Sequence, residues 1–164
     1  MPVKKLTQLS LLTAIALIIF IIELRIPHIV PIPGVKLGLA NIVTVYAMYH
    51  YSPKETLMIL SVRILLGSVF GGNISAIMYS LSGALLCFCG MLILKRLIDE
   101  KYIWICSIIG AVLHNTGQII TAILIMKTTA VLSYFPFLIV SGCITGAFTG
   151  ICAQVLISRV NFTG

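Results

Sequence analysis

Long apolar runs separated by short polar connections extend along almost the whole chain. The runs cover residues 6–23, 37–51, 55–70, 74–94, 102–126 and 134–158. About 20 apolar residues in an α-helix cross a hydrocarbon core about 30 Å thick, and several of these runs reach that length. The pattern predicts a single all-α domain over residues 1–164, an integral membrane bundle of six helices.

Composition agrees with a membrane location. Of 164 residues, 60% are hydrophobic and 9% are charged, and the mean hydropathy is +1.15. A soluble domain of this size has no interior large enough for so much apolar surface. The formal charge of +7 would suggest nucleic acid in a soluble protein. Here nearly all basic residues lie in connections between apolar runs, so no nucleic-acid partner is expected.

The basic residues also predict an orientation. With a cytoplasmic N-terminus, six spans place seven of them inside and three outside, which follows the positive-inside rule. The inside set is Lys4, Lys5, Lys54, Lys95, Arg96, Lys101 and Arg159, and the outside set is Arg25, Lys36 and Lys127. We therefore expect a multi-pass protein of the cell membrane with both termini in the cytoplasm.

The eleventh basic residue, Arg63, lies in the middle of the third run. A charge at that depth costs about 2.5–3.5 kcal/mol on insertion scales, so the side chain must face the bundle interior or a partner. Arg63 is therefore a candidate ligand-binding residue. The alternative is a structural salt bridge with Glu23 or Glu55.

The fifth run, 110-GAVLHNTGQIITA-122, places several polar side chains near the predicted membrane midplane. His114 and Gln118 are four residues apart and share one helix face, and Asn115 lies beside them. They indicate either a ligand cavity or a structural hydrogen-bond network. No second histidine or carboxylate stands at ligand spacing from His114, so no metal or cofactor is expected.

The segment 31-PIPGVKLGLAN-41 interrupts the apolar pattern. Its prolines and Gly34 exclude regular helix, and a helix of about 15 residues after Lys36 would span only roughly 22 Å. We expect a loop that enters the outer half of the bundle and brings Lys36 and Asn41 to a site; a plain outer loop is the alternative. A second break, 71-GGNIS-75, would bring Asn73 to the same mouth.

Two sets of small residues indicate close helix contacts. Gly142, Gly146 and Gly150 recur every four residues and so share one face of the sixth helix, which predicts helix packing. Ser10 and Ala14 are also four residues apart, in the first run, and an exposed small-residue face there could dock a partner protein.

The motifs GVKLGLANIV, SVRILLGSVFGG and HNTGQ resemble the membrane family of heptaprenyl diphosphate synthase component I, also called the Gx transporter family. That family is similar to the substrate-binding S components of energy-coupling-factor transporters. The resemblance implies a ligand in the outer half of the bundle. It also implies that Ser10 and Ala14 match the small residues that contact a transmembrane coupling subunit.

Two hypotheses follow. The first is an S-component-like subunit for uptake of a small solute, which works with a separate ATP-driven coupling module. Its ligand-binding residues would be Lys36, Asn41, Arg63, Asn73, His114, Asn115 and Gln118. The second is a non-catalytic membrane accessory subunit of isoprenoid or quinone metabolism, or of quinone-linked electron transfer, with an isoprenoid ligand, membrane lipid and a soluble prenyl synthase as partners.

No enzymatic activity is expected under either hypothesis. A prenyl synthase holds Mg²⁺ through clustered aspartates, because a hard cation prefers carboxylate oxygen. This chain has one aspartate, Asp99, and no GxxxxGK[ST] motif for nucleotide binding.

Overall fold

The computed structural model describes residues 2–25, 38–71 and 76–159, and their regular structure is entirely helical. The α-helices are α1 (Val3–Arg25), α2 (Asn41–His50), α3 (Pro53–Phe70), α4 (Ala76–Leu97), α5 (Ile103–Met126) and α6 (Phe135–Arg159). Short 3₁₀ helices, Glu100–Tyr102 and Ala130–Tyr134, precede α5 and α6. The predicted all-α class is confirmed.

Four helical segments are long and apolar enough to cross a membrane: Val3–Glu23, Ile77–Leu97, Glu100–Met126 and Ala130–Arg159. Large apolar side chains such as Leu11 and Ile144 are exposed on their outer faces, as lipid contact requires. These features support a membrane protein. The helix α2, with 10 residues, is only about 15 Å long, and the 18 residues of α3 include Lys54, Glu55 and Arg63. Six complete spans therefore stay a prediction.

The helix boundaries follow the apolar runs closely, with one difference at α2. The predicted run begins at residue 37, whereas α2 begins only at Asn41. Residues 38–40 form a turn, in which the backbone N–H of Asn41 donates to the carbonyl of Gly38 at 2.8 Å. Gly38 has a φ of 69°, a conformation that favours glycine. The second helix is therefore shorter than predicted.

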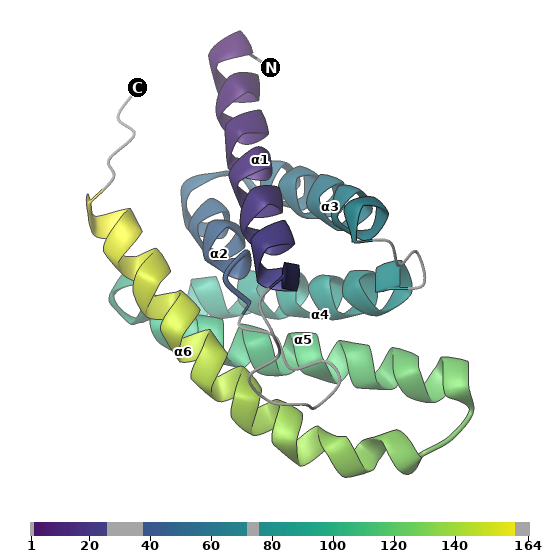
Figure 1. Ribbon diagram of the computed structural model, residues 1–164. Helices are drawn as coiled ribbons and strands as arrows, with labels where there is room; N and C mark the ends of the chain where they lie inside the picture. The colour runs from purple at the N-terminus through teal and green to yellow at the C-terminus, as the bar shows by residue number, and fades with distance from the viewer. Residues whose placement is uncertain (1, 26–37, 72–75, 160–164) are drawn as a thin grey trace.

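Helix α5 lies between α4 and α6 (Figure 1). Its contact with α4 depends on Gly83 and Gly117, since a Cβ atom on Gly117 would lie 2.8 Å from the Cα atom of Gly83. Two hydroxyl groups join the same helices: Ser82 donates to the carbonyl of Gly117 at 3.2 Å, and Thr121 donates to Ser82 at 2.6 Å. Small residues thus allow the two backbones to approach closely.

The contact between α5 and α6 uses the three glycines that recur every four residues on α6. Gly142, Gly146 and Gly150 are all buried. A Cβ atom added to Gly146 would lie 2.7 Å from the Cα atom of Ile108. A Cβ atom added to Gly150 would lie 2.6 Å from the Cα atom of Trp104. This glycine face therefore lies directly against the backbone of α5.

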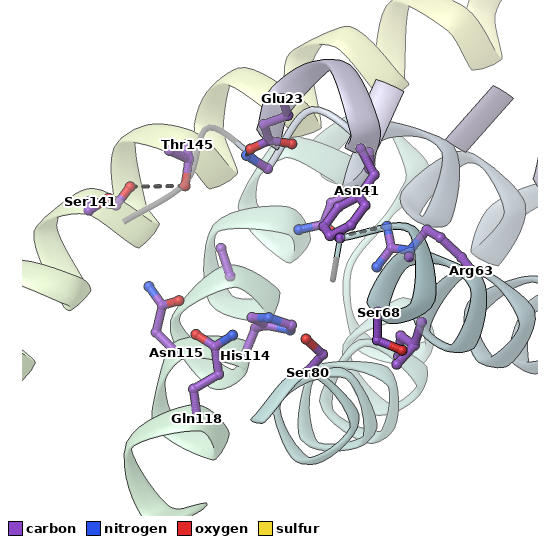
Figure 2. Close-up of a pocket in the computed structure, with 17 residues that line it drawn as sticks. Glu23, Asn41, Arg63, Ser68, Ser80, His114, Asn115, Gln118, Ser141 and Thr145 are labelled. Carbon is purple, nitrogen blue, oxygen red and sulfur yellow. Dashed lines mark hydrogen bonds between the residues drawn. The ribbon is translucent and has the colours of Figure 1, made fainter. Parts of the chain in front are cut away.

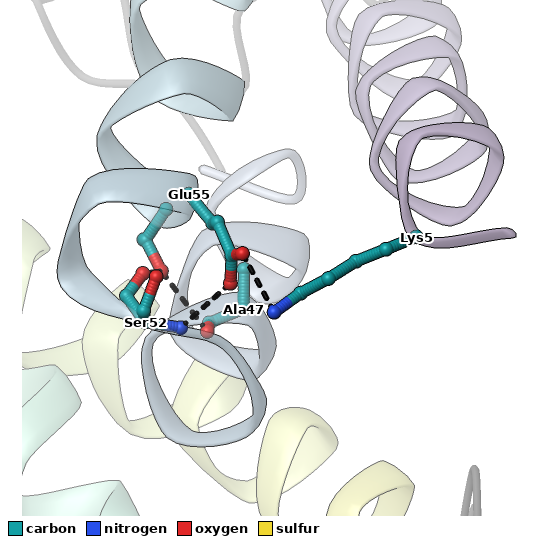
Figure 3. A network of polar contacts seen from close by, with 5 residues as sticks. Lys5, Ala47, Ser52 and Glu55 are labelled. Atoms are coloured by element: carbon teal, nitrogen blue, oxygen red, sulfur yellow. Dashed lines mark hydrogen bonds and ion pairs between the residues drawn. The ribbon is translucent and has the colours of Figure 1, made fainter. Parts of the chain in front are cut away.

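The turn between α2 and α3 is held by polar contacts that also reach α1 (Figure 3). Lys5 of α1 forms an ion pair with Glu55 at 2.6 Å. Glu55 also accepts the backbone N–H of Ser52, which caps α3. The hydroxyl of Thr56 donates to the carbonyl of Ala47 at 3.0 Å. These contacts hold the α2–α3 turn together and attach it to α1.

We expect the Gly146→Val variant to be less stable, because the added methyl groups would meet the backbone of α5. Overpacking of this kind costs about 1–3 kcal/mol. The measurement is the midpoint of thermal unfolding in detergent. The control is Ile144→Val on the same helix, where the side chain is 67% exposed. Equal midpoints for the two variants would contradict the proposed packing role of the glycine face.

Candidate functional site

A cavity of about 280 Å³ lies in the bundle, and all six α-helices contribute to its lining (Figure 2). Most of its polar groups are side chains from apolar helices, where each needs a partner. The polar side chains that line it are Glu23, Asn41, Arg63, Ser68, Ser80, His114, Asn115, Gln118, Ser141 and Thr145. The cavity is the main candidate site of the described residues.

Arg63 supplies a positive charge to the cavity. Its side chain is 8% exposed, and its Nη1 atom donates to Asn41 Oδ1 at 3.1 Å and to Thr44 Oγ1 at 3.2 Å. Both acceptors belong to α2, so these hydrogen bonds join α3 to the first turn of α2. On its inner side Arg63 also borders a pocket of about 30 Å³, which is room for roughly one water molecule.

Glu23 of α1 supplies a negative charge to the same cavity. Its side chain is 8% exposed, and its carboxylate accepts the backbone N–H of Gly38. The alternative role of Arg63, a salt bridge with Glu55, is not formed, because Glu55 is paired with Lys5 near the start of α3. The alternative pair with Glu23 is not formed either: within residues 2–25, 38–71 and 76–159, Arg63 has no ion-pair partner. Its hydrogen bonds there go to neutral side chains.

The opposite wall of the cavity carries neutral hydrogen-bonding groups from α4, α5 and α6 (Figure 2). On α5, Asn115 donates through Nδ2 to the carbonyl of Leu138 at 2.7 Å. That nitrogen would lie 2.9 Å from a Cβ atom on Gly142, so the glycine leaves room for this contact. No hydrogen bond to a described residue engages the Gln118 amide, which therefore has donors and an acceptor available for a ligand.

Five of the seven predicted ligand-binding residues line this one cavity: Asn41, Arg63, His114, Asn115 and Gln118. The other two, Lys36 and Asn73, lie outside the described residues. Ser10 and Ala14 are exposed on α1 and take no part in the cavity lining. The remaining polar groups of the α5 motif face elsewhere: Thr116 bonds to its own helix, and Thr121 bonds to α4.

The sequence pattern does not indicate half of the polar lining. Ser68, Ser80, Ser141 and Thr145 are common in apolar helices, where they often bond to their own backbone, so their presence carries little signal. Thr145, for example, donates to the carbonyl of Ser141 at 2.9 Å. Glu23 did offer a signal, since an acid at the end of an apolar run needs a partner. The sequence pattern suggests Glu23 only as a counter-ion for Arg63.

The cavity is suited to recognition by charge and hydrogen bonding. Only Glu23 among the four acidic residues lines it; Glu55 pairs with Lys5, and Asp99 and Glu100 lie near the start of α5. Within the described ranges, no three His, Cys, Asp or Glu side chains are grouped so as to hold a metal ion. The donor set in the cavity therefore favours an organic ligand over a metal centre.

Comparison with known proteins gives one family. The sequence profile described as heptaprenyl diphosphate synthase component I matches residues 12–156 of this chain. No curated protein and no solved structure gives a significant match.

We expect Thr44→Val to destabilise the protein by about 1.5–3 kcal/mol. Valine has nearly the same shape as threonine but no hydroxyl group, so the buried Arg63 guanidinium loses a hydrogen-bond acceptor. In an Arg63→Met background the same substitution should cost less, since the charge is gone. Thermal unfolding of the two single variants and the double variant in detergent measures the coupling. Thr7→Val, on the exposed face of α1, is the control. A Thr44→Val effect that persists unchanged without Arg63 would argue against this contact.

Proposed function

Because the chain belongs to the heptaprenyl diphosphate synthase component I family, we propose that it is a non-catalytic membrane subunit that binds a small polar ligand in its central cavity and works with a separate partner. One observation carries the ligand-binding part: polar side chains from six apolar helices converge on a cavity of about 280 Å³. A bundle stabilised by packing alone has no need to collect so many polar groups around a space.

The size of the cavity favours a small ligand. A volume of about 280 Å³ is close to the lower end of the range for small-molecule sites, about 300–1,000 Å³. A heptaprenyl chain has seven isoprene units, or about 35 carbon atoms, and would need a volume several times larger. A prenyl tail would therefore have to lie outside this cavity.

The non-catalytic part rests on the acidic residues. Prenyl transfer through Mg²⁺ needs carboxylates that meet at one place. The chain has four acidic residues, and they are distributed over three separate locations: the cavity, the α2–α3 turn and the α4–α5 connection. The family name suggests the partner that would supply the chemistry, a soluble prenyl synthase component.

Uptake of a solute is the second candidate function, and the small polar cavity is the observation that favours it. Under this reading the chain resembles an S component, Lys36 and Asn73 would complete the ligand site, and an ATP-driven coupling module would be the partner. Ser10 and Ala14 are exposed on α1, as a docking face for that module requires.

Both readings assign the protein to the cell membrane, with six spans and both termini in the cytoplasm. The basic residues support this orientation, since seven of the ten in connections and termini would face inward. The short length of α2 does not change this orientation. If α2 and α3 together enter and leave the membrane on the same side, the later helices keep their predicted direction.

We predict that Gln118→Leu reduces the amount of small molecule retained by the gently solubilised protein, because leucine has a similar volume but no hydrogen-bonding groups. The control is Gln8→Leu, the same change on α1 away from the cavity lining. Native mass spectrometry measures the bound mass per chain. Retention of the same molecule in equal amounts by both variants would contradict ligand binding in the cavity.

The orientation can be measured by cysteine labelling in a variant without the five native cysteines. We expect Thr129→Cys, in the α5–α6 connection, to react with a membrane-impermeant maleimide in intact cells. Asp99→Cys, in the α4–α5 connection, should react only after permeabilisation. Both positions are exposed. The opposite labelling pattern would place the termini outside.

A further inference from the structure

The central cavity contains two opposite charges, and the proposed function uses only one of them. Arg63 can bind an anionic group, but Glu23 would repel it. Both side chains are 92% buried, from their exposed fractions of 8%, so neither charge is well screened by water. The role of Glu23 therefore restricts which ligands the cavity can accept.

Each charge is held in place by its own neutral partners. Arg63 is fixed by Asn41 and Thr44, and Glu23 by the backbone N–H of Gly38. The guanidinium and the carboxylate do not form an ion pair with each other, although both line the same cavity. Figure 2 shows them on either side of Asn41. Two charges of opposite sign that form no salt bridge with each other leave a positive and a negative position for a ligand.

The charge balance decides between ligand classes. Among the described residues that line the cavity, the two with acidic or strongly basic side chains are Arg63 and Glu23, and their charges cancel. A ligand with one anionic group would leave an uncompensated negative charge in the bundle, and a purely cationic ligand would leave a positive one; both are costly in a low-dielectric interior. A diphosphate, with several negative charges, fits worst. A molecule with one group of each sign keeps the cavity neutral and gives each buried charge a partner.

We propose that the ligand of this cavity is a small zwitterion, such as an amino acid or a related amino-carboxylate, with its anionic group at Arg63 and its ammonium group at Glu23. This inference rests on the proposed ligand-binding function. The neutral wall formed by Asn115, Gln118 and the hydroxyl groups of α4 and α6 contacts the rest of the ligand. Hydrogen bonds there add shape and polarity requirements without changing the charge balance.

The first test identifies the molecule retained by the unmodified protein in native mass spectrometry. Its accurate mass, and its reactions with amine-specific and carboxyl-specific reagents, show which charged groups it carries. A molecule with both groups is the expected result. A prenyl diphosphate, another purely anionic molecule or a neutral one would overturn the zwitterion assignment while leaving ligand binding intact.

The second test uses Glu23→Gln, which keeps an oxygen acceptor for Gly38 but removes the charge. Occupancy by the zwitterion should fall by about tenfold or more, since a hydrogen bond to a charged group is lost. Glu100→Gln, the same change at an exposed position outside the cavity, should leave occupancy unchanged. If Glu23 only anchors the turn at Gly38, the Gln variant will retain the ligand fully, and the inference fails.

A third measurement covers the case in which no ligand survives purification. The thermal midpoint of the ligand-free protein is recorded with each of the standard amino acids, and with the N-acetyl and carboxamide derivatives of any that stabilise it. Stabilisation by an amino acid but by neither derivative is expected. If no amino acid stabilises the protein, or if an N-acetyl derivative stabilises it equally, the inference is overturned. Loss of binding in Gln118→Leu but not in Gln8→Leu tests ligand binding in the cavity separately.

Discussion

The burial of one guanidinium group within an apolar bundle is the constraint on which the site depends. Arg63 needs hydrogen-bond partners among these apolar helices, because an isolated buried charge costs several kcal/mol. Its hydrogen bonds to Asn41 and Thr44 place the start of α2 against α3. Glu23 also holds the turn before α2, because its carboxylate accepts the backbone N–H of Gly38. Two buried charges from α1 and α3 thus hold one short segment, and that segment forms one side of the cavity.

The other side of the cavity is made by a different kind of interaction. Helices α4, α5 and α6 approach so closely that backbone meets backbone, and glycine is required at these contacts. Gly117 faces Gly83 on α4, while Gly146 and Gly150 face α5. Tight packing of this type holds the α5 backbone in place, so His114, Asn115 and Gln118 project from a rigid wall. Such a wall reduces the entropy that a ligand would lose in ordering its site.

These two halves divide the work of recognition. The α1–α3 half carries the charges, which under the proposed function would discriminate between ligands by the sign and number of their ionic groups. The α4–α6 half carries neutral amide and hydroxyl groups, which would discriminate by hydrogen-bond geometry. The family name points to isoprenoid synthesis, whereas the dimensions and the charge balance of the cavity suit a small polar molecule. A binding subunit whose ligand is separate from the product of its partner reconciles the two.

The sequence by itself determined the helices and half of the polar positions that line the cavity. Apolar runs located the helices to within a few residues, because the membrane requires continuous apolar segments. The four-residue spacing of His114 and Gln118, and of the α6 glycines, placed each set on one face, since helix periodicity is a local property. Arg63 was identified because a charge within an apolar run is exceptional on composition alone.

The tertiary structure decided which of these groups meet. Glu55 lies eight residues before Arg63 in the same helix, yet it pairs with Lys5 of α1. Glu23 lies on another helix and shares the cavity with Arg63. The start of α2 depends on a turn at Gly38 whose partner is 15 residues away. Contacts between helices depend on how their faces are oriented in three dimensions, and a single sequence carries no direct record of that orientation.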